Sequence, residues 1–170
     1  MNHRVRNMTR AAIIAALYAV LTHLQNLLLP GSASWAIQCR LSEALCVLAF
    51  FTPAAIPGLA IGCLVFNITF AAALPLDWLG GSLATFLAAL LMRKTRHLRF
   101  RGYPLPAMLM PALTNALLVG WELTAYIGGG FGLNALYVAL GELIVLLIPG
   151  SILLHILEKR GIAQRLFPKF

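Results

Sequence analysis

The sequence predicts an all-α integral membrane protein, a single transmembrane domain over residues 1–170 built as a bundle of six helices. Composition gives the first reason, because 61% of the residues are apolar and only 11% are charged, roughly half the charged fraction of a soluble domain. Long apolar stretches give the second, and the position of the basic residues gives the third. A soluble fold needs polar residues to cover its core, and this chain has too few.

The apolar stretches divide at proline, glycine and charged residues into segments near the length that a bilayer requires, about 20 residues. The predicted helices are 8–29, 41–56, 58–74, 79–93, 104–127 and 134–157. The first follows a basic head, as in a signal peptide, but its apolar run is too long for one and predicts a retained helix. Only Pro53 and Pro57–Gly58 separate the second segment from the third, so one bent, re-entrant unit is an alternative there.

Twelve of the thirteen lysine and arginine residues fall in three clusters that flank apolar segments. They are Arg4, Arg6, Arg10, Arg93, Lys94, Arg96, Arg99, Arg101, Lys159, Arg160, Arg165 and Lys169. An even number of spans places all three clusters on one side of the membrane, as the positive-inside rule requires. Both termini are therefore expected in the cytoplasm. The net charge of +8 is explained by this anchoring, and no nucleic-acid partner is expected.

Four of the five acidic residues fall in the predicted outer half: Glu43, Asp77, Glu122 and Glu142. A carboxylate inside a bilayer costs on the order of 2.5–3.5 kcal/mol, so such groups usually face a cavity or a partner. Arg40 is the only basic residue outside the three clusters. This balance favours a ligand that is cationic or rich in N–H donors. The alternative is that Arg40 and Glu43 form a structural pair and the other carboxylates hold helices together.

Further polar and aromatic residues lie near these carboxylates. Asn115, Glu122 and Tyr126 share one face of the fifth segment, while Asn134 and Tyr137 precede Glu142 in the sixth. The candidate substrate-binding residues are Glu122, Glu142, Asn115, Asn134, Tyr137, Tyr126, Asn67, Asp77, Arg40, Glu43 and Trp35.

The first segment carries a stripe of alanines: Ala11, Ala12, Ala15, Ala16 and Ala19. Small residues at helical spacing let another helix approach closely within lipid. The stripe is explained either by packing inside this bundle or by docking of a partner protein.

Several activities lack their motifs. Cys39, Cys46 and Cys63 form no CxxC pair and the four histidines are scattered, so the cysteines are interpreted as small apolar residues and neither a metal nor a cofactor is expected. The chain has no GxxxxGK[ST] loop and no HExxH or GxSxG motif. It is therefore not expected to be an enzyme, or to use ATP by itself.

Five stretches of the chain resemble the QueT family: Arg40–Leu45, Phe51–Leu59, Gly81–Thr85, Asn115–Leu123 and Ala139–Leu143. The resemblance implies the substrate-binding (S) component of an energy-coupling factor transporter, an ABC-type vitamin importer of the bacterial cell membrane. Such six-helix components bind solute in their outer half, and a membrane scaffold (T component) with two ATPase subunits drives its transfer. The alanines of the first helix touch the scaffold in that family.

The substrate that the resemblance implies is a queuosine precursor, a 7-deazaguanine base such as queuine or its aminomethyl precursor. One carboxylate can accept the adjacent donors of a guanine-like edge. A second carboxylate can pair with a cationic arm, and Trp35, Trp78, Trp121, Tyr126 or Tyr137 could stack on the base. The alternative function is a self-sufficient secondary carrier, in which Glu122 or Glu142 relays protons.

Overall fold

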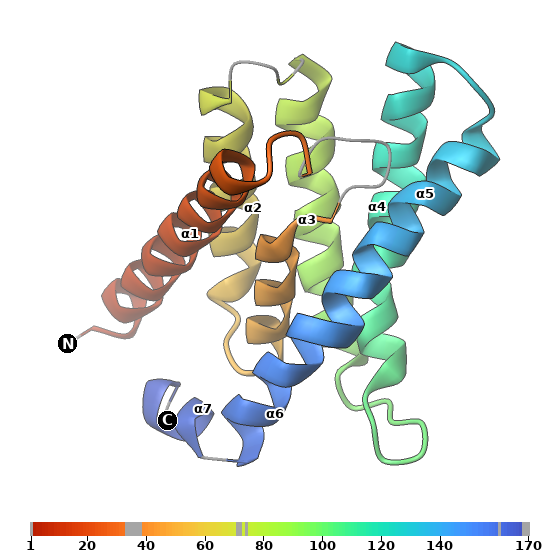
Figure 1. Cartoon of the computed structure of the whole chain (residues 1–170). Coiled ribbons are helices and arrows are strands. Elements are labelled where there is room, and N and C mark those ends of the chain that lie inside the picture. The colour runs from red at the N-terminus through yellow and green to blue at the C-terminus, as the bar shows by residue number, and fades with distance from the viewer. Residues whose placement is uncertain (1, 33–38, 71–72, 74, 160, 168–170) are drawn as a thin grey trace.

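The computed structural model describes residues 2–32, 39–70, 73, 75–159 and 161–167, and no strand is present among them (Figure 1). The prediction of an all-α chain is confirmed. Trp35 lies outside the described residues. The elements are α1 (His3–Leu28), the 3₁₀-helix η1 (Leu41–Phe50), α2 (Ala55–Thr69), α3 (Pro75–Thr95), α4 (Leu105–Ile127), α5 (Phe131–Val145), the π-helical turn η2 (Leu146–Gly150), α6 (Ser151–Lys159) and α7 (Ile162–Leu166).

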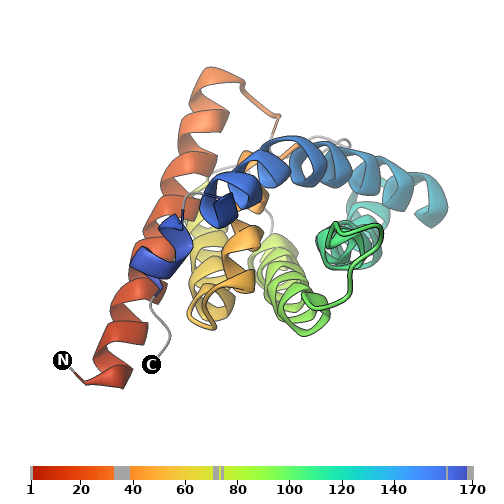
Figure 2. The ribbon, with the colours of Figure 1, turned by 90° about the horizontal axis from the view of Figure 1, so that it is seen from below.

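Consecutive long helices pack side by side, α1 on α2, α2 on α3, α3 on α4 and α4 on α5. The last long helix, formed by α5, η2 and α6, crosses the bundle obliquely from α4 toward α1 (Figure 2). The short η1 lies inside this arrangement and contacts α1, α2, α3 and η2. Its Cys46, Val47 and Ala49 are completely buried. The polypeptide segment at the centre of the protein is therefore a 3₁₀-helix, a conformation that often marks functional or strained sequence.

Within the described part of the chain, three helices are long and apolar enough to cross a membrane: α1, α3 and the continuous helix Phe131–Lys159. The apolar helices η1 and α2 are shorter, with 10 and 15 residues. Ten residues of 3₁₀-helix extend about 20 Å, less than the roughly 30 Å of a bilayer's hydrocarbon core. All six predicted segments contain helix, and the number of complete spans stays a prediction.

The predicted boundaries of the second and third segments were wrong. The second ends at Phe50 instead of 56, and the third covers Ala55–Thr69 instead of 58–74. Pro57 lies in the first turn of this helix rather than preceding it, because the first N–H groups of a helix have no intrahelical partner and a proline there loses nothing. The turn between the two helices is closed at Thr52, whose Oγ1 accepts the N–H of Ala54 at 3.3 Å.

The sixth predicted segment, 134–157, is helical throughout but not uniform. Around Pro149 the chain forms η2, a π-helical turn between α5 and α6. A proline inside an α-helix lacks the N–H for one hydrogen bond and clashes with the preceding turn. The wider turn accommodates it without ending the helix.

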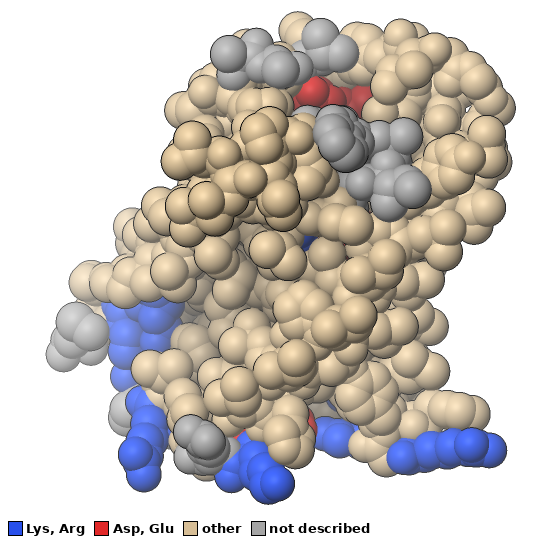
Figure 3. All heavy atoms as spheres, in the orientation of Figure 1, with Lys and Arg blue, Asp and Glu red and all other residues tan. Residues whose placement is uncertain are grey.

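The basic clusters lie at one end of the bundle, the end that also holds both termini (Figures 1 and 3). Some of these guanidinium groups have structural roles as well. Arg93 donates to the carbonyl of Ala49 at 2.9 Å and Arg96 to that of Phe50 at 2.8 Å. Both carbonyls belong to the last turn of η1, so the second basic cluster caps the C-terminus of the central helix. Figure 3 shows a patch of acidic side chains near the opposite end.

Two glycines of α2 bring it against the backbone of α1. A Cβ at Gly58 would lie 2.7 Å from the carbonyl oxygen of Ala11, and one at Gly62 would lie 2.7 Å from that of Ala15. Neither position tolerates any side chain at this separation. The α1–α2 contact is therefore a close helix pair of the kind that small residues permit in lipid.

Candidate functional site

The charged centre of the protein is Arg40, the residue that precedes η1. It is only 9% exposed, its Nη1 lies 3.7 Å from the Sγ of Cys63, and its guanidinium lies 5.8 Å from the centre of the Phe66 ring. It interacts electrostatically with Glu43, Glu122 and Glu142. The single basic residue outside the anchoring clusters is thus buried among three of the predicted carboxylates.

A pair of glycines on α3 makes room for this assembly. A Cβ at Gly81 would lie 3.1 Å from the Nδ2 of Asn67 and 3.9 Å from the Nη1 of Arg40, while a Cβ at Gly80 would lie 2.9 Å from the Oε2 of Glu122. Polar groups from α2, from the start of η1 and from α4 therefore converge on a stretch of α3 that has no side chains. Sequence reasoning missed Gly80, although adjacent glycines inside a helix signal a close approach.

Glu122 projects from α4 toward the start of α3. It is 3% exposed, and among the described residues its Oε1 has no hydrogen-bond partner. Its carboxyl lies beside that of Asp77, with which it interacts. Asn67 donates to the main-chain carbonyl of Asp77 at 2.6 Å, and the hydroxyl of Tyr126 accepts the N–H of Leu76 at 3.1 Å. Asn67 and Tyr126 therefore fix the first turn of α3, which positions the Glu122–Asp77 pair.

Glu142 lies between α5 and α4, where the Nδ2 of Asn115 donates to its Oε1 at 2.8 Å. Both residues are buried, at 3% and 4% exposure, and the Oε2 of Glu142 has no partner within the described part of the chain. An unsatisfied buried acceptor costs about 1–3 kcal/mol. Two such oxygens, on Glu122 and Glu142, are what a ligand with N–H donors would satisfy.

Glu43 differs from the other two glutamates because it is fully engaged. It is 1% exposed, its Oε1 accepts the hydroxyls of Tyr18 and Thr85, the latter at 3.1 Å, and its Oε2 accepts the thiol of Cys46 at 3.2 Å. These donors come from α1, α3 and η1 itself. The geometry therefore favours the structural alternative for Glu43, which joins three helices.

The remaining candidates are not brought to the carboxylates by any hydrogen bond among the described residues. Asn134 donates to the Oγ1 of Thr124 at 3.0 Å and to the carbonyl of Gly128 at 3.1 Å, so it closes the glycine-rich turn between α4 and α5. Tyr137 is partly buried on α5. Trp78 and Trp121 are 39% and 59% exposed, as aromatic residues at a membrane interface often are.

Sequence reasoning missed a polar stripe on α1. Tyr18, Thr22 and Gln25 are spaced i, i+4 and i+7, which places them on one helix face, and all three are buried. The hydroxyl of Thr22 donates to Ser42 at 2.7 Å, and Gln25 binds the N–H of Leu41 at 2.8 Å. This spacing within an apolar segment was the signal that could have identified them. They attach the start of η1 to α1.

The cysteines are also more than apolar filling. The Sγ of Cys63 accepts from Asn67 at 3.6 Å as well as contacting Arg40, and Cys46 donates to Glu43. Both thiols are therefore part of the buried polar network. Among the described residues no three histidine, cysteine, aspartate or glutamate side chains gather as metal ligands.

The alanine stripe of α1 divides into two faces. Ala15 and Ala19 are buried at 8% and 7% exposure, and Ala15 belongs to the close contact with α2. Ala12 and Ala16 are exposed and Ala11 is intermediate. Packing inside the bundle therefore accounts for Ala15 and Ala19, whereas docking of a partner at Ala12 and Ala16 stays a prediction.

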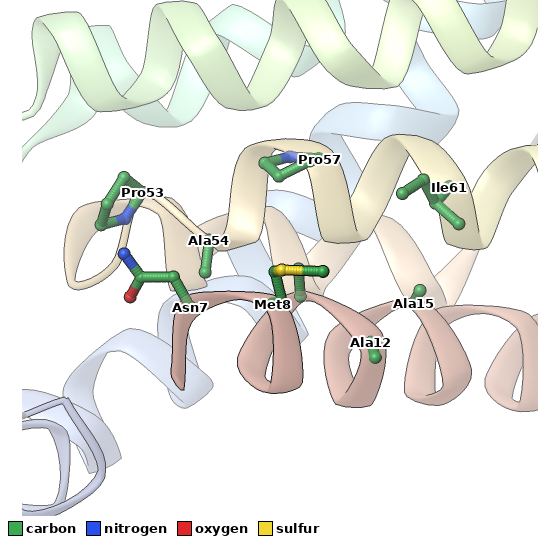
Figure 4. A pocket seen from close by; sticks show the side chains of 9 residues that line it. Asn7, Met8, Ala12, Ala15, Pro53, Ala54, Pro57 and Ile61 are labelled. Atoms are coloured by element: carbon green, nitrogen blue, oxygen red, sulfur yellow. The ribbon is translucent and has the colours of Figure 1, made fainter. Parts of the chain in front are cut away.

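A groove of about 530 Å³ lies between α1 and the start of α2 (Figure 4). Its lining is almost entirely apolar: Asn7, Met8, Ala11, Ala12, Ala15, Pro53, Ala54, Pro57 and Ile61. It contains none of the carboxylates, and it lies toward the end of the bundle that carries the basic clusters (Figures 1 and 3). The groove is thus distinct from the charged centre around Arg40.

The family model described as QueT transporter matches residues 8–159, nearly the whole chain, which confirms the resemblance in the sequence. No curated protein and no solved structure matches the chain.

The Glu43 network makes a prediction about stability. Tyr18→Phe removes the donor from α1 and leaves a buried carboxylate oxygen with one donor fewer, so it should destabilise the protein by about 1–3 kcal/mol. Thermal unfolding of the purified protein in detergent measures this. Tyr137→Phe is the matched control and should melt like the parent, because no hydrogen bond of its hydroxyl is present in the described structure. Equal melting temperatures for Tyr18→Phe and the parent would contradict the assigned role.

Proposed function

Because the chain belongs to the QueT transporter family, we propose that it is the substrate-binding component of an energy-coupling factor importer. It captures a 7-deazaguanine base, a queuosine precursor such as queuine or its aminomethyl precursor, from outside the cell. The family is one of transport proteins and not of enzymes, so the site binds and releases its ligand unchanged.

The observation that supports this proposal most directly is the pair of buried, unpartnered carboxylate oxygens on Glu122 and Glu142. Leaving these oxygens without hydrogen bonds is unfavourable. In a purely structural bundle, buried polar atoms are normally hydrogen-bonded within the protein. A 7-deazaguanine base supplies adjacent N–H groups, and its arm supplies an ammonium. Both donor types match acceptors that are already desolvated.

The sequence lacks a nucleotide-binding loop, so an ATP-driven importer would require partner proteins. In the proposed importer the energy comes from ATP through separate subunits, a membrane scaffold and two ATPases. The exposed alanines Ala12 and Ala16 suit such a scaffold, because their small side chains let a partner helix approach the backbone of α1. The adjoining apolar groove extends the same surface.

The proposed topology is six spans in the bacterial cell membrane, with both termini in the cytoplasm. The gathering of lysine and arginine at one end of the bundle supports it. The patch of acidic side chains near the other end then faces the outside, where the solute arrives. The short helices η1 and α2 would each span the membrane with local thinning of the bilayer.

A second function uses the same carboxylates differently. In a self-sufficient carrier, Glu122 or Glu142 would relay protons and couple uptake to a proton gradient. This candidate needs no partner protein, which separates it from the first experimentally.

The function is tested with the purified chain in lipid nanodiscs and in sealed vesicles. Calorimetry should detect saturable binding of queuine or the aminomethyl base, and mass spectrometry should find such a base released from freshly purified protein. Vesicles containing this chain alone should take up no base when a proton gradient is imposed. Gradient-driven uptake by the chain alone would establish the carrier instead, and failure to bind either base would reject the substrate assignment.

The docking surface is tested at its exposed alanine. Ala16→Trp should leave binding of the base by the isolated chain unchanged and abolish uptake in cells, because a bulky ring prevents close approach of a scaffold helix. Leu117→Trp, at a residue 53% exposed on α4, is the matched control and should transport normally. Ala15→Trp should instead lower the melting temperature, since Ala15 packs against Gly62. Normal uptake by Ala16→Trp would exclude this face as the docking surface.

The topology is tested with reporter enzymes. A reporter fused after Phe170 should be active only in the cytoplasm, and one inserted near Gly130, in the turn between α4 and α5, only outside. The reason is the one-sided placement of the basic clusters. Activity of both reporters on the same side would contradict an arrangement with cytoplasmic termini and an external α4–α5 turn.

A further inference from the structure

We propose that Glu122 and Glu142, each with one unpartnered carboxylate oxygen, bind different parts of one ligand. Glu142, together with Asn115, recognises the uncharged donor edge of the base, whereas Glu122, together with Asp77, binds a cationic arm. This inference rests on the proposed function, and it assigns each half of the ligand to its own residues.

The neighbours of Glu142 distinguish it from Glu122. Its hydrogen-bond partner is a neutral amide, the Nδ2 of Asn115 at 2.8 Å, and its second oxygen is buried without a partner. With Oε1 of Glu142 engaged by Asn115, the remaining groups of the pair are two acceptor oxygens, the Oε2 of Glu142 and the amide oxygen of Asn115, and the second N–H of the amide. A guanine-type edge presents the complementary row: an amino group and a ring N–H that donate, next to a carbonyl that accepts. Glu142 and Asn115 can therefore bind this edge through hydrogen bonds, without needing any charge on the ligand.

The helices that carry Asn115 and Glu142, α4 and α5, pack closely enough to hold these two side chains at a fixed separation. On the same pair of helices, a Cβ at Gly120 would lie 2.8 Å from the Cα of Ala135, so α4 and α5 are in backbone contact. Val119 and Val138 are buried nearby in one apolar cluster. Rigid elements on both sides fix the separation of the two polar groups, as discrimination between hydrogen-bonding patterns requires.

The neighbour of Glu122 is a second carboxylate, that of Asp77. When both carboxylates are ionised, their charges repel each other, and the repulsion grows as water is excluded. Glu122 is 3% exposed and one of its oxygens has no partner, while Asp77 is partly exposed near the start of α3. A cation between the two relieves the repulsion and satisfies the open acceptor. No neutral donor edge does both.

The positive charge of Arg40 does not remove this requirement. Its guanidinium contacts Cys63 and Phe66 and interacts with Glu43 and Glu142 in addition to Glu122. One guanidinium cannot balance this group of carboxylates. The Glu122–Asp77 pair therefore retains negative charge, and a ligand with a single ammonium group complements it.

The test combines two ligands with two variants. The ligands share the same 7-deazaguanine base, one with an aminomethyl arm that is cationic at neutral pH and one with a nitrile arm that is neutral. Glu122→Gln should weaken binding of the aminomethyl base about 10- to 150-fold, the range for a lost charge-assisted bond, and leave the nitrile base unaffected. Glu142→Gln should weaken binding of both bases by a similar factor. Calorimetric affinities give all values directly.

The matched control is Glu158→Gln, because Glu158 pairs with Arg99 at 3.5 Å at the basic end of the bundle. It should bind both bases like the parent. Melting temperatures establish that each variant is folded. If Glu122→Gln does not fold, Asp77→Asn should give the same selective loss of the cationic base, and if Glu142→Gln does not fold, Asn115→Ala should weaken binding of both bases.

Each outcome has one meaning. Selective loss in the Glu122 or Asp77 variant, with parallel loss in the Glu142 or Asn115 variant, supports the division. Parallel loss of both bases in every variant overturns it, while leaving the protein a binder of 7-deazaguanine bases. Unchanged binding of both bases in folded variants overturns it as well. If the parent binds neither base, the proposed function itself fails, independently of the division.

Discussion

The burial of Arg40 is the constraint on which the rest of the structure depends. Moving an ion from water into a protein interior costs several kcal/mol even after relaxation, and only close counter-charges and hydrogen bonds repay that cost. Arg40 is compensated by carboxylates from three elements, Glu43 on η1, Glu122 on α4 and Glu142 on α5. The helices must therefore meet around one residue, and a bundle that separated them would leave several charges uncompensated in a dry environment.

Such a meeting point is possible only where helices lack side chains. Gly80 and Gly81 let α3 approach the polar groups of its neighbours, and Gly58 and Gly62 let α2 approach α1. In lipid there is little hydrophobic drive to press helices together, so close packing and hydrogen bonds hold the bundle. The glycines therefore contribute to the charged centre and to the helix packing at the same time.

The helix α1 has two faces with different surroundings. One face carries Tyr18, Thr22 and Gln25, which hold η1 and thereby the position of Arg40. Another face leaves Ala12 and Ala16 exposed. A partner that tilts α1 would pull on the same hydrogen bonds that support the charged centre. The proposed docking surface and the proposed binding site therefore share one helix.

Composition and pattern alone determined the helical class, the approximate positions of the six helical segments, the basic clusters and the family, and they named three carboxylates that the structure buries, Glu43, Glu122 and Glu142. These features depend on apolar length and charge, which are local properties of the chain. The boundaries around Pro53 and Pro57 were not predictable in the same way, because a proline is harmless in the first turn of a helix and disruptive elsewhere. Its effect depends on where the helix begins, and packing determines that.

Only the tertiary structure decided which of four similar carboxylates are saturated and which are open. Glu43 and Glu142 each stand two residues after a leucine in an apolar segment, and this local pattern does not distinguish them. Glu43 meets Tyr18 and Thr85, which are far away in the sequence, whereas Glu142 meets Asn115 and keeps one oxygen without a partner. The same reasoning separates Ala15 from Ala16. Hydrogen bonds and exposure belong to pairs of residues brought together in space, so the sequence could name the groups but not assign their partners.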